Sequence, residues 1–204
     1  LDVRVGKGKP GRMVFKMYDD KVPIAVKNFK AFCEGTKGKT MHYKGSDFHY
    51  SYPGFGTMGG SSSHHGIEPE TIYGPYFRRE ECDASHDKRG ILSALHYGDV
   101  SKMTAQFMIT FNRARFLDNT NVPMGELIEG FDTLKEIESA GTPVGRPGAR
   151  IVIEGCGVLE ADESQEFKEK KHRNILAEEQ KPRPDWDMWP ARIPGGKKDA
   201  SETQ

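Results

Sequence analysis

The sequence contains little cysteine and no long apolar run. Its three cysteines, Cys33, Cys82 and Cys156, lie far apart and form no CxxC pair, which argues against a disulfide framework and a structural zinc site. No stretch approaches the ~18 apolar residues that a membrane-spanning helix requires. We therefore expect no membrane insertion and an intracellular, reducing location, which is either cytoplasmic, an axoneme included, or mitochondrial.

An excess of charge of either sign is also absent. The 30 lysines and arginines balance 30 aspartates and glutamates. Proteins that wrap nucleic acid carry excess positive charge, because contacts to phosphate dominate their affinity. Nucleic acid is therefore not expected as the main partner, although a local basic patch is compatible with a zero sum.

Length and composition limit the chain to one core of ordinary size. Its 204 residues, of which 35% are hydrophobic, suit one domain of roughly 100 to 200 residues with an appendage. From about Glu160 the sequence becomes dense in charge and rich in proline, without the apolar spacing of a core element. This change predicts a folded domain over residues 1–159 and a charged C-terminal extension over residues 160–204.

Periodic patterns within residues 1–159 indicate many short strands and two helices. Pro23 suits the first turn of a helix and Gly35 its end, and a second helix is expected around residues 131–137. Alternating or short apolar runs predict strands at 13–18, 91–95, 107–111, 124–128 and 151–153. Many short strands with two helices are typical of a barrel or sandwich with helical caps.

The stretch FHYSYPGFGTMGG, residues 48–60, has the pattern of a sheet surface that bends into a loop. Its aromatic residues alternate, and a Pro-Gly step predicts a turn. The only candidates for reactive chemistry in it are His49, hydroxyl groups and aromatic faces. The pattern therefore predicts either a catalytic wall or a wall from which the chemistry has been lost.

Neither a metal site nor a cofactor is expected. His64 and His65 are adjacent in a Ser-rich loop, where they could approach a metal together with His42 or His49. Neighbours on an extended chain usually point in opposite directions, however, so solvent-exposed histidines are the simpler interpretation.

No cysteine nucleophile is expected either. Cys33 lies on the apolar face of the first predicted helix, where a small core residue is the simplest interpretation. Cys82 and Cys156 have no obvious basic activator near them in sequence.

The order of motifs along residues 1–159 resembles the cyclophilins, which are peptidyl-prolyl cis-trans isomerases. The motifs that carry the resemblance include YKGSDFH, PGF, IYG, GILS, QFMIT, FLD, GELIEGFDTLKEIE and GCGVL. The resemblance implies a mainly β fold, namely a closed eight-stranded antiparallel β-barrel capped by two α-helices. It also implies an active groove on the face built from residues 48–60.

In that family an arginine follows the FH pair and hydrogen-bonds the nitrogen of the substrate proline. This contact weakens the partial double bond behind a barrier of ~18–20 kcal/mol. Tyr50 occupies the position here, and a phenol lacks the fixed charge and forked donors of a guanidinium. By analogy with the loss of an oxyanion-hole donor, we expect a cost on the order of 10²–10³ in rate.

Other groove positions differ from the family pattern as well. Small or apolar side chains, Gly56 and Met58, replace a methionine and a glutamine that grips the peptide, and Ser61 replaces an acid. Leu95, His96 and Tyr97 stand where the family has a strand of small residues, and their greater bulk should narrow the channel that holds the peptide. The degenerate groove implied by the resemblance consists of His49, Tyr50, Phe55, Met58, Gln106, Met108, Phe116, Leu117 and Asn121.

Four of these positions keep the family residue, namely His49, Phe55, Gln106 and Leu117. Their retention has a second explanation, because Phe55 and Leu117 also suit core or rim packing and Gln106 can satisfy backbone groups. Because the other groove positions have changed, ordinary isomerase activity is not expected.

The extension carries both tryptophans of the chain, in the segment KPRPDWDMWPARIP. Trp and Arg are enriched at binding hot spots, and prolines lower the entropy cost of docking an extended segment. A solvated, flexible tail is the alternative. The residues predicted to contact partner proteins are Trp186, Met188, Trp189 and Arg192.

Two functions follow from these patterns. The first is a structural or scaffold subunit of a large macromolecular assembly, a pseudoenzyme that joins other protein subunits through its extension. The second is an active isomerase, or a chaperone that binds prolyl peptides, with a remodelled groove. An axonemal complex, a mitochondrial complex and a spliceosome-like particle all fit the sequence.

Overall fold

The computed structural model describes residues 1–38, 41–61 and 71–159. His64 and His65 lie outside the described residues. So does the predicted extension over 160–204, with the candidate contacts Trp186, Met188, Trp189 and Arg192. The predicted domain boundary after residue 159 stays a prediction.

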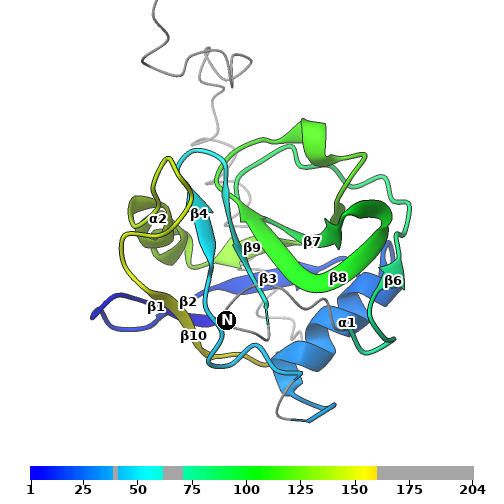
Figure 1. The fold of residues 1–204 in the computed structure, drawn as a ribbon, viewed down its shortest axis with the longest axis horizontal. Helices are drawn as coiled ribbons and strands as arrows, with labels where there is room; N and C mark the ends of the chain where they lie inside the picture. The colour runs from blue at the N-terminus through cyan, green and yellow to red at the C-terminus, as the bar shows by residue number, and fades with distance from the viewer. Residues whose placement is uncertain (39–40, 62–70, 160–204) are drawn as a thin grey trace, which may run out of the picture.

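Ten strands and two α-helices make up the described part of the chain (Figure 1). The helices are α1 (Pro23–Glu34) and α2 (Phe131–Ser139), and a short 3-10 helix, η1, spans Arg115–Leu117. The strands are β1 (Asp2–Val5), β2 (Gly11–Arg12), β3 (Val14–Met17), β4 (Tyr50–Tyr52), β5 (Gly56–Gly59), β6 (Phe77–Arg78), β7 (Ile91–Tyr97), β8 (Asp99–Thr110), β9 (Val122–Glu129) and β10 (Ile151–Gly155).

The strands form two antiparallel sheets. One sheet has the order β10–β1–β2, and the other has the order β3–β9–β7–β8–β5–β4, with β6 paired to β8. The predicted mainly β, antiparallel architecture with two helices is confirmed. Ladder pairings among the described strands do not close into one ring, although an isolated bridge joins Asp47 to Val152. The closed eight-stranded barrel therefore stays a prediction.

Helix α1 begins and ends where the sequence predicts. Pro23 occupies its first turn, and Gly35 ends it in the left-handed conformation with φ of 68°. The first turn has no local side-chain cap. Instead, the carboxylate of Glu80 accepts hydrogen bonds from the backbone N–H groups of Ile24 and Ala25 at 3.0 and 2.8 Å, which satisfies two of the unpaired donors at this end.

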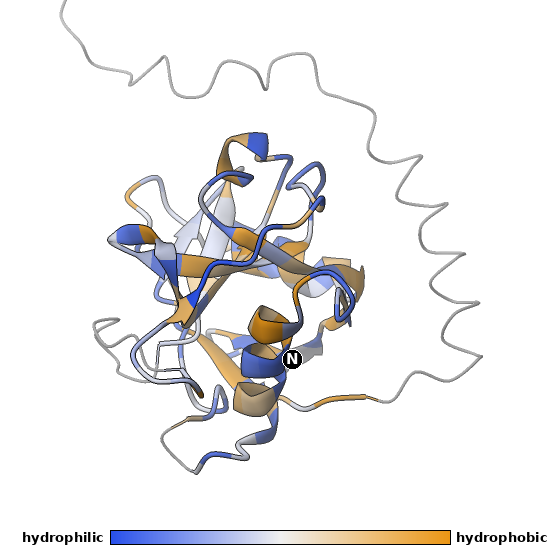
Figure 2. Cartoon of the chain, turned by 90° about the vertical axis from the view of Figure 1, so that its right-hand side faces the viewer, coloured by the Kyte–Doolittle hydropathy of each residue, from blue (hydrophilic) through white to orange (hydrophobic). Residues whose placement is uncertain are grey.

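An aromatic cluster fills the space between α1 and the larger sheet. The ring of Phe107 on β8 meets Phe29, Tyr43 and Phe48 edge to face, with centroid distances of 5.4, 5.1 and 5.6 Å. The buried hydroxyl of Tyr43 donates to the carbonyl of Ala105 at 2.6 Å. Hydrophobic and hydrophilic residues alternate along the elements that enclose this core (Figure 2).

A buried polar network fastens η1 to the sheet. The imidazole of His86 contacts Asp118 through Nδ1 at 2.7 Å and Ser93 through Nε2 at 2.9 Å. Asp118 follows η1, and it also accepts hydrogen bonds from the backbone N–H of His86 and the hydroxyl of Ser85. With Asp118 ionised, Nδ1 donates to its carboxylate and Nε2 accepts from Ser93. This network holds the segment that carries Phe116.

Ionisation in this network is set by burial and by its hydrogen bonds. Burial lowers the pKa of His86, although the neighbouring Asp118 opposes the shift. Burial would raise the pKa of Asp118, but its hydrogen bonds from His86 and Ser85 lower it overall. The neutral imidazole is therefore the form that the folded state favours.

Acidification from pH 7 to pH 5 is expected to destabilise the fold through His86. Because folding lowers the pKa of this histidine below its unfolded value of ~6.5, the stabilisation is complete above pH ~6.5 and is lost as the pH falls below it. Each unit of the difference corresponds to ~1.4 kcal/mol. Urea unfolding of His86→Asn should show a smaller slope of unfolding free energy against pH than the wild type.

His49 provides the matched comparison, because burial lowers its pKa in the same direction. The double variant with His49→Asn should therefore have the flattest profile. A wild-type stability that stays level between pH 7 and pH 5 would show that neither histidine controls it.

Candidate functional site

The positions around Tyr50 form one row across the larger sheet. Tyr50 on β4 stands opposite Met58 on β5, Met58 stands opposite Met108 on β8, and Met108 stands opposite Ser93 on β7. Directly opposed residues share a face of the sheet. Tyr50 is 45% exposed, whereas Met108 and Ser93 are fully buried, so the row leads from an exposed side chain to buried ones.

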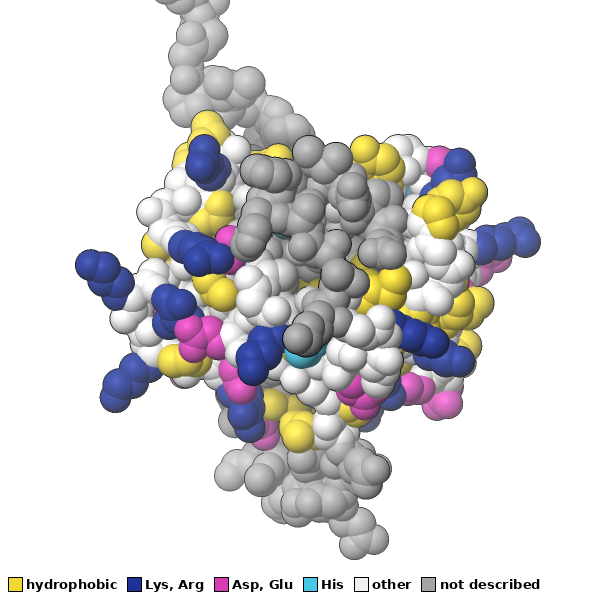
Figure 3. Space-filling model, turned by 60° about the horizontal axis from the view of Figure 1, so that its bottom comes forward, with side chains coloured by type: hydrophobic (Ala, Val, Ile, Leu, Met, Phe, Trp, Pro, Cys, Tyr) yellow, Lys and Arg dark blue, Asp and Glu magenta, His cyan; other side chains and the backbone are white. Residues whose placement is uncertain are grey.

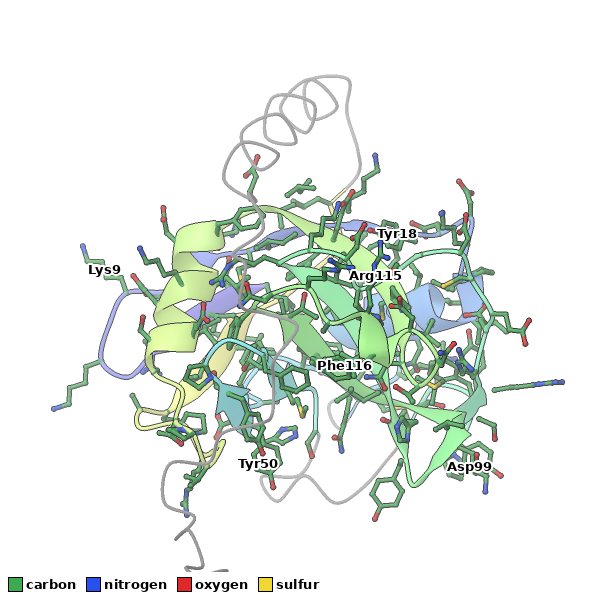
Figure 4. All side chains as sticks on the ribbon, turned by 90° about the horizontal axis from the view of Figure 1, so that it is seen from above. Lys9, Tyr18, Tyr50, Asp99, Arg115 and Phe116 are labelled. Carbon is green, nitrogen blue, oxygen red and sulfur yellow. The ribbon has the colours of Figure 1, made fainter. Side chains whose placement is uncertain are left out.

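Four aromatic rings form a continuous surface that we call the aromatic strip, namely Tyr50, Tyr52, Phe55 and Phe116. Tyr50 stacks on Tyr52 at 6.0 Å between centroids, and Tyr52 contacts Phe55 at 6.3 Å. Phe55 stacks on Phe116 at 5.7 Å. Phe116 is 68% exposed. Figure 4 labels the two ends of the strip, Tyr50 on β4 and Phe116 in η1.

Local backbone contacts hold the strip in place. The hydroxyl of Thr57 donates to the carbonyl of Tyr50 at 2.9 Å. The backbone N–H of Ser51 donates to the carbonyl of Gly145 at 2.7 Å. A Cβ added at Gly145 would lie 2.2 Å from the ring of Tyr52, so only glycine permits this approach.

Two departures from the family pattern compensate each other. A Cβ built on Gly56 would lie 2.9 Å from the terminal methyl of Met108 and 2.9 Å from the carbonyl oxygen of Ile109. Met108 therefore fills the space that a side chain at residue 56 would need. A side chain restored at residue 56 would therefore require both Met108 and the backbone at Ile109 to move, because close-packed interiors leave no spare volume.

Four buried polar atoms have no hydrogen-bond partner among the described residues, and two of them belong to predicted groove residues, His49 Nδ1 and Asn121 Oδ1. Asn121 is only 4% exposed. Burial lowers the pKa of His49, although a hydrogen bond to the backbone of Asp47 opposes the shift, so its imidazole is neutral near pH 7. Buried polar groups are normally paired, so these two atoms suit an internal water as a partner.

The other predicted site residues lie on β8, η1 and β7. Gln106 is half-buried on β8 and Leu117 is half-buried in η1. Leu95, His96 and Tyr97 continue β7 to a turn at Gly98, which has φ of 69°, and β8 begins immediately after it. Tyr97 is 56% exposed. The narrowing of a channel by these three residues stays a prediction.

Sequence reasoning missed Tyr52 as a member of the surface. Its signal was present, because residues 50 and 52 of one strand share a face. Reasoning from sequence also missed the hydrogen bond between His86 and Ser93. These residues are only seven positions apart, but they meet because the loop that carries His86 lies beside strand β7, which carries Ser93.

The described residues contain no group of three or more His, Cys, Asp or Glu side chains that could hold a metal ion. No helix in the described ranges is long and apolar enough to cross a bilayer. Basic and acidic side chains are interspersed on the face shown in Figure 3, and several cations are paired, as Arg150 is with Asp47 at 3.0 Å.

Comparison with known proteins agrees with this architecture. The family model for cyclophilin type peptidyl-prolyl cis-trans isomerase/CLD matches residues 1–158. A peptidyl-prolyl cis-trans isomerase from Encephalitozoon cuniculi (strain GB-M1) is 40% identical over 162 residues, which cover 78% of this chain and 92% of that protein. The matched residues contain every strand and helix described above. The chain therefore belongs to the cyclophilin-type peptidyl-prolyl cis-trans isomerase family.

Proposed function

We propose that this protein binds proline-containing segments of other proteins through the aromatic strip, with isomerase catalysis largely lost, as a structural subunit of a larger assembly. The observation that carries the proposal is Tyr50, a neutral, 45% exposed side chain at the head of the row across the sheet. The family chemistry calls for an arginine at this position.

Catalysis of prolyl isomerisation needs stabilisation that appears only in the transition state. A phenol offers one neutral donor, whereas a guanidinium offers a fixed charge and several donors in a rigid fork. Beside Tyr50, Met58 supplies no amide to grip the peptide backbone. Both the charge and the positioning contacts are thus weaker, and proper positioning contributes much of an enzyme's rate.

Binding, in contrast, is well served by these residues. Proline-rich peptides adopt a preformed extended helix, and proteins recognise them with rows of aromatic side chains. The four rings of the aromatic strip, each in contact with the next, provide such a row, and Phe116 is its most exposed member.

The assembly role rests on the sequence of the extension. Trp186, Met188, Trp189 and Arg192 are the residue types that dominate binding hot spots, and they lie among prolines. Protein subunits are the partners that this composition suits best. We also propose an intracellular, reducing location, because the chain has few cysteines. The two sheets are proposed to close into the eight-stranded barrel that the family resemblance implies.

A working isomerase is the second candidate function. The relative that is 40% identical carries the name peptidyl-prolyl cis-trans isomerase, and His49, Phe55 and Gln106 keep the family residues. Catalytic rate separates the two candidates, because peptide binding is common to both.

A protease-coupled assay should detect little isomerase activity in the purified protein. We expect a rate at least ~100-fold below that of an ordinary cyclophilin, by analogy with the loss of a transition-state donor. Tyr50→Arg alone should not restore the rate, because Met58 supplies no amide to position the peptide backbone for catalysis. Tyr50→Phe is the matched control and should leave the residual rate unchanged. A wild-type rate close to that of an ordinary cyclophilin would instead establish the working isomerase.

Peptide affinity should depend on Phe116. Phe116→Ala removes the most exposed ring of the strip, and we expect it to raise the Kd for a fluorescent peptide of Ala-Pro repeats about tenfold, as for a hot-spot aromatic. Fluorescence anisotropy gives the Kd. Tyr76→Ala is the matched control, because Tyr76 is 48% exposed but lies outside the strip. Equal effects of the two substitutions would show that the strip is not the binding surface.

Removal of the extension should separate folding from assembly. A chain truncated after Leu159 should fold and yet fail to co-purify with the native complex, as detected by mass spectrometry. Trp186→Ala with Trp189→Ala should do the same, because two anchors of ~2 kcal/mol each amount to roughly a thousandfold in affinity if they add. A double variant that assembles normally but unfolds at a lower temperature would indicate that the extension packs on its own domain.

A further inference from the structure

The segments that build the aromatic strip carry charge of one sign. Residues 48–60 and 111–117 supply its four rings, and residues 140–146 include the loop that packs against Tyr52. Together these segments contain three arginines, no lysine and no acidic residue. The whole chain, in contrast, balances 30 basic against 30 acidic residues. The strip therefore lies in a locally positive part of a neutral molecule.

Arg146 belongs to the loop that packs against the β4 half of the strip. Two backbone hydrogen bonds join this loop to β4, from the N–H of Ser51 to the carbonyl of Gly145 at 2.7 Å and from the N–H of Thr142 to the carbonyl of Ser51 at 3.1 Å. The hydroxyl of Thr142 also donates to the carbonyl of Arg146 at 2.8 Å. Arg146 is exposed, and it directly follows the glycine against which the ring of Tyr52 lies.

Two further arginines lie beside the η1 half of the strip. The side-chain amide of Asn112 donates to the carbonyl of Gly54 at 3.0 Å, which ties the start of their segment to the turn before β5. Both arginines are exposed. Figure 4 labels one of them in η1, directly before Phe116. We call the three residues the strip arginines, namely Arg113, Arg115 and Arg146.

The acidic side chains next to these segments in sequence are already engaged. Asp47 is paired with Arg150 at 3.0 Å, and Glu138 is paired with Arg89 at 2.6 Å. The carboxylate of Asp118 accepts hydrogen bonds from two neighbouring residues. The strip arginines, in contrast, form no ion pair with any described residue. Their charge is therefore available to a bound molecule.

We propose that the aromatic strip selects proline-containing segments of partner proteins that carry aspartate or glutamate on both sides of the proline core. This inference rests on the proposed function and names the class of segment that the strip takes. The rings contact the prolines, and the guanidinium groups attract the carboxylates. Charges at the rim of a binding surface mainly set the partner choice and the association rate. The strip arginines are thus specificity-determining residues.

The spacing of the rings sets the length of the core that the strip accepts. Successive ring centroids are 6.0, 6.3 and 5.7 Å apart. A polyproline helix rises ~3.1 Å per residue, so the strip spans at most about six residues. Acidic residues just outside such a core would lie beside the two ends of the strip.

Single-stranded nucleic acid is the other polyanion that aromatic rings and arginines together can hold. The number of cations favours a peptide. Affinity for nucleic acid grows with the number of phosphates that basic residues neutralise, and the segments of the strip provide only three such residues. An oligonucleotide therefore enters the test as a competitor.

The test measures the Kd of the full chain for three fluorescent peptides by anisotropy. All have a core of three Ala-Pro repeats, which is flanked at each end by two aspartates, two serines or two lysines. At about 20 mM salt we expect the aspartate peptide to bind about tenfold more tightly than the serine peptide, and the lysine peptide to bind most weakly. At about 500 mM salt the difference should fall to about twofold or less, because the charges are screened.

Combined substitution tests the strip arginines. Arg113→Gln, Arg115→Gln and Arg146→Gln together should reduce the preference for the aspartate peptide over the serine peptide from about tenfold to about twofold or less at low salt. Exposed side chains without ion pairs contribute little to folding, and thermal unfolding of the variant checks this.

The matched control removes the same charge elsewhere. Lys7, Lys9 and Arg78 are exposed and lie in the β1–β2 turn and on β6, which contribute no ring to the strip. Lys7→Gln, Lys9→Gln and Arg78→Gln together should keep most of the preference. An equal loss of preference in both triple variants would overturn the proposal, because net charge alone would then explain it.

The remaining outcomes separate this proposal from the proposed function. Equal Kd values for the three peptides at low salt would overturn the charge selection, whereas binding of the serine peptide that depends on Phe116 would leave the proposed function standing. Failure of all three peptides to bind would overturn both. A single-stranded oligothymidylate that binds more tightly than the aspartate peptide would show that the strip takes nucleic acid instead.

Discussion

The register of β8 sets the positions of both the aromatic core and the aromatic strip. This strand pairs with β5, β6 and β7, and its successive side chains point to opposite faces. Phe107 packs against Tyr43 in the core, and Met108 belongs to the row that ends at Tyr50. A slip of one residue would exchange these faces. The hydrogen bond from Tyr43 to the carbonyl of Ala105 helps to hold the register.

In the function proposed for this protein, the exchange of a guanidinium for a phenol would separate binding from catalysis. An aromatic ring contacts a proline ring through its surface, and this contact is similar in the ground state and in the twisted transition state. Such uniform binding raises affinity and leaves the barrier unchanged. A charged donor aimed at the proline nitrogen acts differently, because it gains strength as the nitrogen loses its conjugation. Tyr50 and Phe116 therefore suit a surface that retains prolyl segments more than one that isomerises them.

Local sequence patterns predicted the helices and strands but not the contacts between them. Period-two alternation located β3, and Pro23 with Gly35 bounded α1, because both signals depend only on neighbouring residues. The predicted strands coincide with observed ones. The number of strands and the hairpin turn at Gly98 were not predicted, because they depend on pairing between strands, which no local pattern encodes. The resemblance located Tyr50 and Phe116.

The aromatic strip is tied to the core by the segment that leads into β4. Tyr50 lies at the end of this segment, and before it Tyr43 and Phe48 pack on Phe107. Backbone hydrogen bonds also tie the segment to α1 and to β10. A displacement of the strip would therefore have to disturb that close-packed cluster, which resists such strain.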